Sequence, residues 1–245
     1  MAEQSCLVTN DWICGEYLRS RSQELADATV QHIGITVVSV LIGLAVAFPL
    51  ALLARRGPRF AGPVLGLTTV LYTVPSLAMF SLLLPLFGLS AALVVTGLVL
   101  YSLTILVRNI LAGLDAVPQE AKEAARGMGY GPGRLLWEVE LPLALPAVMA
   151  GLRIATVSTV ALTTVGSLVG KGGLGNLIED ALPSFFKAQV LTAAVLCVVL
   201  AVVADLLLLG LQRLLTPWTR ISGTVEAAPA KTDAGPPAPA TVKAG

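Results

Sequence analysis

Charged residues are scarce in this sequence. They make up 13% of its 245 residues, whereas soluble domains carry roughly 25%. The hydrophobic share is 56% and the mean hydropathy is +0.83, so the chain has too few polar residues to cover a water-exposed surface. This composition excludes a soluble domain and a disordered chain. It predicts a protein that is largely surrounded by lipid.

Histidine and cysteine are rare, and the net charge is small. One His and three Cys leave too few ligands for a zinc site or a histidine-dependent active site. A net charge of +1 does not provide the clustered positive charge that nucleic-acid binding needs. We therefore expect no metal site, no catalytic residue, no cofactor bound by this chain and no nucleic-acid partner. Cys6 and Cys14 form a disulfide or remain two free thiols, and the sequence leaves both possibilities open.

Long uncharged runs predict where the chain crosses a membrane. Residues 33–54 form an uncharged run of 22, and about 20 apolar residues span the hydrocarbon as a helix. The 48 uncharged residues between Arg59 and Arg108 suffice for two spans, with a turn at the Pro- and Gly-containing residues 85–90. The predicted fold is therefore an all-α integral membrane protein with about five transmembrane helices, at 33–54, 62–84, 91–111, 143–169 and 190–211. These lie in a membrane domain over 32–216, between an N-terminal segment over 1–31 and a disordered tail over 217–245.

Basic residues are concentrated on one side of these spans. Three arginines lie between residues 55 and 59, and three more Lys or Arg residues lie between 122 and 134, whereas the turn at 85–90 has none. Cytoplasmic loops carry an excess of Lys and Arg, so this pattern places the N-terminus outside the cell and the C-terminus in the cytoplasm. The odd number of spans agrees. We expect a multi-pass protein of the cell membrane.

The polar stretch over 115–142 lies on the predicted cytoplasmic side. Its first half predicts a short amphipathic helix with an apolar stripe of mostly small side chains at Ala121, Ala124, Ala125 and Met128. Glycines between 127 and 133 then end the helix. An alanine stripe has weak lipid affinity but lets another backbone approach closely. We therefore favour a groove on a cytoplasmic protein over the lipid interface as its binding partner.

Six positions in this stretch resemble the EAA loop of ABC-type importer permeases, which reads E-A-A-x3-G-x9-I-x-L-P. The matching residues are Glu123, Ala124, Ala125, Gly129, Leu141 and Pro142, and Val139 stands in place of the Ile. In that family the loop is a coupling helix that docks into a cleft of a cytoplasmic ATPase. The resemblance implies that Glu123 and the two alanines form the docking face, that Gly129 permits the turn, and that Leu141 and Pro142 set the start of the fourth span.

Three further stretches, over 72–78, 151–155 and 170–175, are similar to permeases for osmoprotectants such as glycine betaine, choline and carnitine. The resemblance covers roughly residues 25–220. It implies a permease subunit that moves compatible solutes and performs no covalent chemistry. The implied partners are an ABC ATPase dimer that binds ATP-Mg, a second permease chain (identical or paralogous), an extracytoplasmic solute-binding protein and membrane lipid. The alternatives are another cargo, such as methionine, and a membrane scaffold that transports nothing.

Aromatic residues within the spans are candidates for the translocation pathway. Aromatic faces attract quaternary ammonium ions, and Pro75 is expected to kink its span. The candidates are Tyr72, Pro75, Ser76 and Tyr101, with ordinary packing as the alternative for the two tyrosines.

Two charges lie inside predicted spans, where an unpaired charge is costly. We expect Asp205 to pair with Arg153 or Arg108, with a substrate or proton role for Asp205 as the alternative. His32 is expected at the membrane interface. The glycine-rich residues 170–176 are expected in a flexible outer loop that meets a binding protein or gates the pathway.

Overall fold

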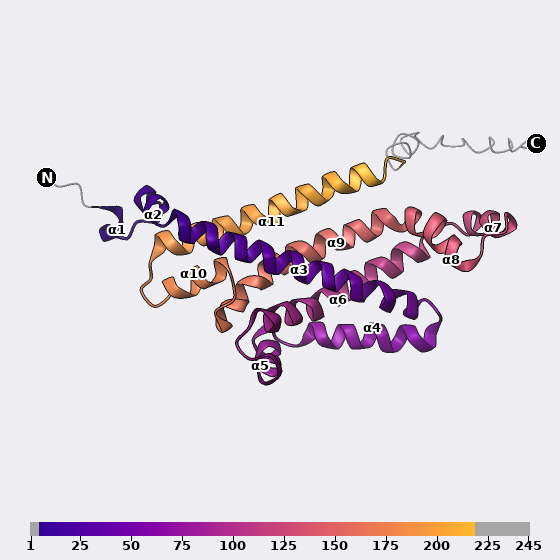
Figure 1. Ribbon diagram of the computed structural model, residues 1–245, viewed down its shortest axis with the longest axis horizontal. Coiled ribbons are helices and arrows are strands. Elements are labelled where there is room, and N and C mark those ends of the chain that lie inside the picture. Colours follow the sequence, from indigo (N-terminus) through magenta and orange to yellow (C-terminus); the bar gives the residue numbers. More distant parts are fainter. Residues whose placement is uncertain (1–4, 219–245) are drawn as a thin grey trace, which may run out of the picture.

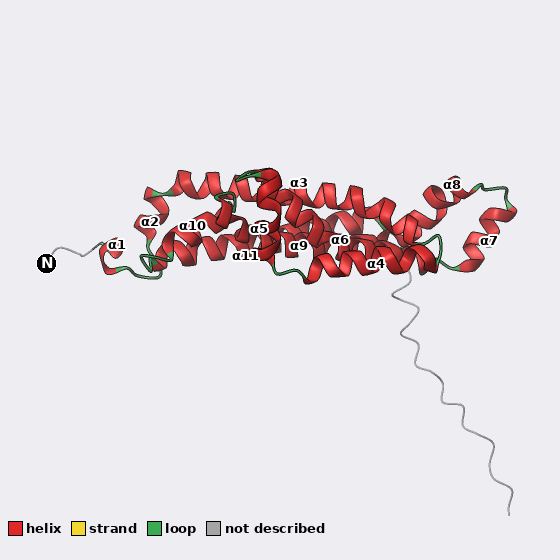
Figure 2. Ribbon diagram, turned by 90° about the horizontal axis from the view of Figure 1, so that it is seen from below, coloured by secondary structure: helices red, strands yellow, loops and turns green. Residues whose placement is uncertain are grey.

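The computed structural model of this chain, described here over residues 5–218, is an elongated bundle of helices (Figures 1 and 2). The elements in chain order are α1 (Cys6–Thr9), α2 (Gly15–Ser20), α3 (Ser22–Ala54), α4 (Pro58–Thr73), α5 (Ser76–Phe87), α6 (Ala91–Asp115), α7 (Gln119–Gly127), α8 (Pro132–Leu135), the π-helical turn η1 (Leu136–Glu140), α9 (Leu141–Thr163), the 3-10 segment η2 (Thr164–Val169), α10 (Leu174–Ala181) and α11 (Lys187–Leu215). The predicted tail over 217–245 falls outside the described residues, apart from its first two.

Four helical stretches of the described chain are long and apolar enough to cross a membrane. They are α3, α6, the continuous helix over 132–169 and α11. The pair α4 and α5 makes a fifth crossing only if it is counted as one broken span. The all-α membrane architecture is confirmed, with four to five crossings.

The predicted span over 62–84 is not a single helix. α4 ends at Thr73 and α5 starts at Ser76, and the two helices meet at 101°. Pro75 disfavours helical backbone at the residue before it, and Val74 is indeed extended, with ψ of 128°. The Val74 carbonyl accepts a hydrogen bond from the Tyr101 hydroxyl of α6. The expected kink at Pro75 is therefore a complete break, which a neighbouring helix stabilises.

Two other helices begin well before the spans that hydropathy predicts. α3 starts at Ser22 rather than at residue 33, because hydropathy detects the part of a helix that lies in lipid and not its polar extension. The helix that contains 143–169 starts at Pro132 and runs through η1 into α9. Only residues 116–131 of the predicted loop therefore lie between the two long helices.

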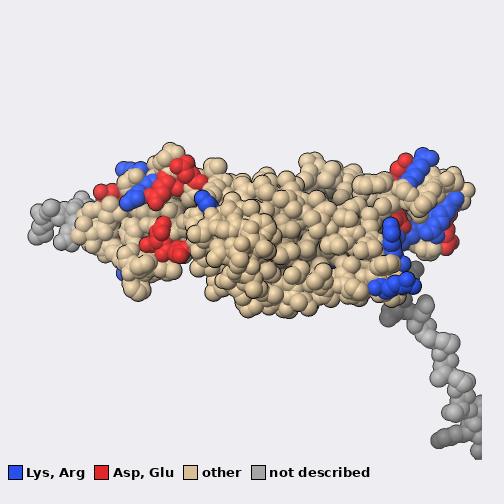
Figure 3. All heavy atoms as spheres, turned by 60° about the horizontal axis from the view of Figure 1, so that its bottom comes forward, with Lys and Arg blue, Asp and Glu red and all other residues tan. Residues whose placement is uncertain are grey.

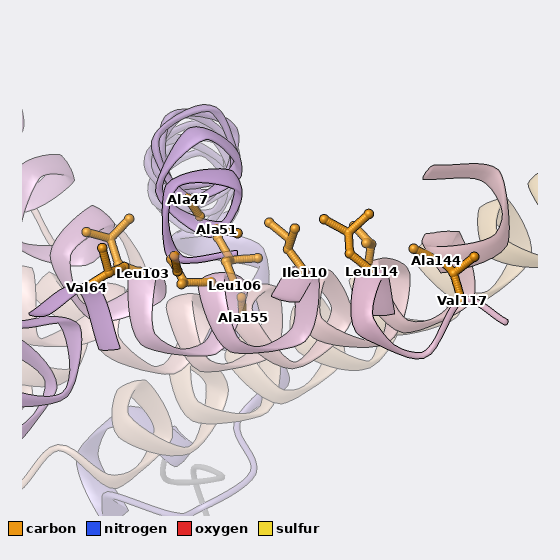
Figure 4. Close-up of a cluster of buried hydrophobic side chains, with 13 residues drawn as sticks. Ala47, Ala51, Val64, Leu103, Leu106, Ile110, Leu114, Val117, Ala144 and Ala155 are labelled. Carbon is orange, nitrogen blue, oxygen red and sulfur yellow. The ribbon is translucent and has the colours of Figure 1, made fainter. Parts of the chain in front are cut away.

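Helix α6 is the centre of the bundle and packs against both α3 and α9. Its buried leucines and isoleucine meet small residues of the two neighbours (Figure 4). The labelled residues of this cluster include Leu103, Leu106, Ile110 and Leu114 of α6, Ala47 and Ala51 of α3, and Ala144 and Ala155 of α9. A Cβ added at Gly43 would clash with the Ser102 hydroxyl. Small residues thus permit close helix contacts, as expected where no hydrophobic effect drives helices together in lipid.

The glycine-rich segment over 170–176 leads into α10, at the end of the bundle where the N-terminal helices lie (Figure 1). It is packed, which corrects the expectation of a flexible loop. Gly173 has φ of +56°, and its Cα faces the backbone of His32 so closely that a Cβ would not fit. His32 is fully buried, and its Nε2 donates a hydrogen bond to the Val160 carbonyl at 3.0 Å. His32 therefore faces neither lipid nor water and joins α3, α9 and the glycine segment; its expected depth at the membrane interface stays a prediction.

The N-terminal residues form a small cap on this same end. Cys6 and Cys14 are joined by a disulfide, which resolves the alternative left open by the sequence. The Asn10 side chain donates from Nδ2 to the Phe185 carbonyl and accepts from the N–H of Lys187, each at 3.0 Å. The cap is thereby fastened to the start of α11.

Candidate functional site

The residues that match the EAA pattern lie at the end of the bundle opposite the N-terminal cap (Figure 1). They form α7 and the segment that leads back into α9. Pro118 precedes α7 with extended backbone, and Glu120 lies in the first turn, where a negative charge favours a helix start. The predicted amphipathic helix is therefore present, and it projects beyond the long helices (Figure 2).

The two faces of α7 have different surroundings. Glu123 and Ala124 are exposed, and Met128 is 69% exposed, whereas Ala125 is only 2% exposed. Glu123 accepts a hydrogen bond from the Gln119 side chain at 3.0 Å, one turn earlier. The structure thus leaves Glu123 and Ala124 open to another protein, while Ala125 packs against its own chain.

Gly129 makes the turn that follows α7. Its φ is +85°, in a region that residues with a Cβ rarely adopt. Its N–H bonds to the Arg126 carbonyl at 2.9 Å, and the N–H of Tyr130 bonds to the Ala125 carbonyl at 3.1 Å. This closes the helix in a compact turn. The structural need for glycine at this position follows from the backbone alone.

Leu141 and Pro142 are the first residues of α9. The N–H of Leu141 bonds five residues back, to the Leu136 carbonyl, which closes the wide π-helical turn η1. Pro142 has no N–H, so residue 142 donates no backbone hydrogen bond where η1 passes into α9. The two residues mark the place where the projecting segment passes into the membrane helix.

Two polar contacts that the sequence did not predict hold this segment in place. The Arg55 guanidinium, directly after α3, donates two hydrogen bonds of 2.6 Å to the carboxylate of Glu140. The Glu140 side chain is only 5% exposed, and its hydrogen bonds raise the pKa of Arg55 above the ordinary value. One feature of the sequence could have predicted this pair. Glu140 is an acidic residue in a mainly apolar segment, next to the start of a span and on the same side as an arginine cluster.

The second contact joins α7 to α6. Lys122 is only 8% exposed, and its Nζ donates a hydrogen bond of 3.4 Å to the Leu114 carbonyl at the end of α6. A cation is favourable at a helix C-terminus. Through Lys122 and the Arg55–Glu140 pair, α7 and the start of α9 are tied to α6 and α3. Of these two contacts, Lys122 holds α7 itself and the Arg55–Glu140 pair holds the segment that leads from α7 into α9.

Arg153 and Asp205, the two charges that the sequence places inside spans, form an ion pair. Arg153 of α9 donates from Nε and Nη2 to the two carboxylate oxygens of Asp205 of α11, each at 2.8 Å. Arg108 instead donates to the Thr69 hydroxyl at 2.9 Å. Asp205 is therefore bound to Arg153 and not to Arg108. The two parallel hydrogen bonds between Arg153 and Asp205 form a bidentate pair, the geometry that stabilises a charge pair best.

The four pathway candidates gather at the break between α4 and α5. The rings of Tyr72 and Tyr101 meet edge to face, with centroids 6.2 Å apart. Pro75 lies at the break, and Ser76 is the first residue of α5. Tyr101 is only 6% exposed, while Tyr72 is 47% exposed. Tyr101 thus has a structural role, because its buried side chain donates a hydrogen bond to the backbone at the break. Tyr72 is the more accessible of the two rings.

The described residues contain no group of three or more His, Cys, Asp or Glu side chains that could hold a metal ion. The arrangement at α7 can transmit a mechanical movement. A short helix with one exposed face, together with the segment that follows it, is connected by hydrogen bonds and an ion pair to the ends of long apolar helices.

Comparisons with known proteins agree with this geometry. Residues 39–221 match the family model described as "Binding-protein-dependent transport system inner membrane component". The osmoprotectant import permease protein OsmW of Salmonella typhimurium is 36% identical over 206 residues, which are 82% of this chain and 96% of that protein. The choline transport system permease protein OpuBB of Bacillus subtilis is 34% identical over 202 residues, 82% of this chain and 93% of that protein.

Among solved structures, an inward-facing conformation of the MetNI methionine ABC transporter shares the fold. Its TM-score is 0.74 at 21% identity, and the match covers 80% of this chain and 98% of that chain. The match to the family model begins within α3 and covers α6, α7, α9 and α11 in full. The chain therefore belongs to the family of binding-protein-dependent transport system inner membrane components, as a membrane permease subunit of an ABC importer whose ATPase is a separate subunit.

Proposed function

We propose that this chain forms part of an importer for compatible solutes with a quaternary ammonium group, such as glycine betaine, choline or carnitine. The observation that carries the proposal is the position of the EAA residues. They lie on an exposed helix at one end of a membrane bundle, in a chain 34–36% identical to permeases named for choline and osmoprotectant transport. A methionine cargo has weaker support, because the likeness to the methionine transporter is at 21% identity and concerns the fold alone.

In this proposal α7 faces the cytoplasm and the N-terminal cap faces outward, as the distribution of arginines indicates. An ABC ATPase dimer, which binds ATP-Mg, grips the exposed face of α7 at Glu123 and Ala124. A second permease chain, identical or paralogous, completes the pathway, because four to five crossings per chain are few for a pore. An extracytoplasmic solute-binding protein delivers the cargo.

The contacts around α7 support a route for coupling. Closure of the ATPase would move α7, and Lys122 and the Arg55–Glu140 pair connect this movement to α6, α3 and α9. A rigid connection of this kind converts a change at the ATPase into a change in the arrangement of the membrane helices. Alternating access follows if the two arrangements open to opposite sides.

The test is ATP-dependent uptake into proteoliposomes that contain this chain with its ATPase and binding protein. We expect accumulation of a radiolabelled quaternary ammonium solute when ATP is enclosed, and none with a nonhydrolysable analogue. Glycine betaine, choline, carnitine, proline and methionine are compared under the same conditions. Uptake of methionine alone would overturn the proposed cargo, and no ATP-dependent uptake of any of the five would overturn the transport proposal.

A further inference from the structure

A pocket of about 370 Å³ lies between the end of α3 and the α7–α8 segment. Three guanidinium groups border it, those of Arg55, Arg56 and Arg126, together with the single carboxylate of Glu140. Part of its wall is apolar and comes from Leu135 and Leu136. The pocket therefore combines a strongly basic rim with a hydrophobic side.

The three guanidinium groups differ in their ion pairs with the part of the chain that the structure describes. Glu140 is occupied by Arg55, through two hydrogen bonds of 2.6 Å. Among residues 5–218, Arg56 and Arg126 form no ion pair. Three guanidinium groups therefore border one cavity against a single carboxylate, and the surplus of charge is positive. Guanidinium binds phosphate in a bidentate manner, so the pocket matches a phosphate in charge.

The position of the pocket at the end of an apolar helix favours a membrane lipid as the source of that phosphate. Arg55 and Arg56 directly follow Ala54, where the apolar helix α3 ends. Trp137, next to the pocket residue Leu136, is 62% exposed and packs on Phe48 of α3 with ring centroids 5.7 Å apart. Exposed tryptophan is typical of the headgroup level of a membrane. Figure 3 shows that charged side chains gather at the two ends of the molecule and are nearly absent from the middle of that face.

The pocket also lies on a different face of α7 from the exposed alanine of the EAA residues. Arg126 follows the buried Lys122 by one helical turn, so it lies on the same side of α7, where its own side chain is exposed and lines the pocket. Ala124, halfway between them, is exposed and lies on the opposite side. The basic rim and the proposed ATPase contact at Ala124 thus lie on different sides of α7.

We propose that this pocket binds the phosphate headgroup of an anionic phospholipid, with the start of an acyl chain against Leu135 and Leu136. Basic pockets between transmembrane helices are suited to anionic headgroups. Because Arg56 belongs to the end of α3 and Arg126 to α7, one lipid would bridge a membrane helix and the projecting helix. The position of α7 would then depend on the anionic lipid content of the membrane. The inference does not depend on which solute is transported.

The test uses the permease assembled with its ATPase in nanodiscs of phosphatidylglycerol and phosphatidylcholine. Native mass spectrometry after transfer to detergent counts the phosphatidylglycerol that remains bound. We expect R56Q and R126Q each to weaken this binding about fivefold, the factor that corresponds to about 1 kcal/mol per basic residue near an anionic surface. The matched control is R59Q, which removes the same charge at the same membrane boundary but outside the pocket.

Each outcome bears on the proposal. Wild-type retention in R56Q and R126Q, or an equal loss in R59Q, would overturn a specific headgroup site. Displacement of the lipid by millimolar inorganic phosphate would show that the pocket selects free phosphate rather than a lipid. Loss of the ATPase from R56Q in phosphatidylcholine as well as in phosphatidylglycerol would assign the arginines to the ATPase contact and reject the lipid site.

Discussion

At the scale of single residues, the Arg55–Glu140 pair shows how one contact serves two purposes. From sequence, Arg55 counts only as one of the basic residues that orient the chain in the membrane. In the structure it also fixes the start of α9, because its two hydrogen bonds reach a carboxylate that is nearly inaccessible to water. A residue that orients the protein during insertion thus also stabilises the folded form.

We predict that Glu140→Gln lowers the free energy of unfolding by about 1–3 kcal/mol, because it weakens a charge-assisted hydrogen-bond pair and leaves Arg55 with only the more distant carboxylate of Asp115, 3.9 Å from its Nε. The measurement is equilibrium unfolding of the purified protein in mixed micelles. Glu138→Gln is the matched control, since Glu138 pairs with Arg134 on the surface, where both side chains are more than half exposed. Equal destabilisation by the two variants would contradict this interpretation.

At the scale of elements, α7 is a short helix whose position depends on the contacts of one face. Its exposed face carries Glu123 and Ala124, and its buried face carries Lys122 and Ala125. A substitution on the exposed face should therefore leave the fold of the permease unchanged. Such a substitution can separate coupling from folding.

We predict that Glu123→Arg reduces ATP-dependent uptake at least tenfold, because it reverses the charge on the face that the ATPase is proposed to grip. Membrane insertion and the unfolding midpoint should remain at wild-type values, as measured by extraction yield and thermal denaturation. Glu138→Arg, the same reversal on an exposed glutamate outside α7, serves as the control. Wild-type uptake by the Glu123→Arg variant would remove α7 from the coupling route.

The elements also show which features the sequence predicts and why others are missed. Uncharged runs and proline or glycine punctuation locate the long helices, since lipid requires apolar side chains along each crossing. The break at Pro75 differs from the predicted kink because its geometry depends on Tyr101, a residue of another helix. The burial of His32 and the packing of Gly173 likewise depend on partners that are distant in the chain. Local patterns carry no information on such contacts.

At the scale of the whole molecule, the two ends of the bundle are chemically distinct. One end has the disulfide-linked cap and α10, and the other has α7 and the cluster of arginines (Figures 1 and 3). A disulfide is stable in an oxidising compartment and rare in the cytosol. This agrees with the orientation that the basic residues indicate.

We predict that a membrane-impermeant maleimide labels Ser184→Cys in intact cells and labels Met128→Cys only after permeabilisation. Both side chains are exposed. Ser184 lies in the turn before α11, and Met128 directly follows α7. The background variant carries C6S, C14S and C197A, so that each protein has one thiol. The reverse pattern would place the N-terminal cap in the cytoplasm and reject the proposed topology.

The hydrogen bonds of Asn10 have a consequence for biosynthesis. Its two partners are backbone groups of Phe185 and Lys187, 175 and 177 positions further along the chain. Translation delivers residues in order, so Asn10 cannot form these two bonds until the chain has been made as far as Lys187. The cap can close its own disulfide early, but it is fastened to the bundle only at a late stage of synthesis.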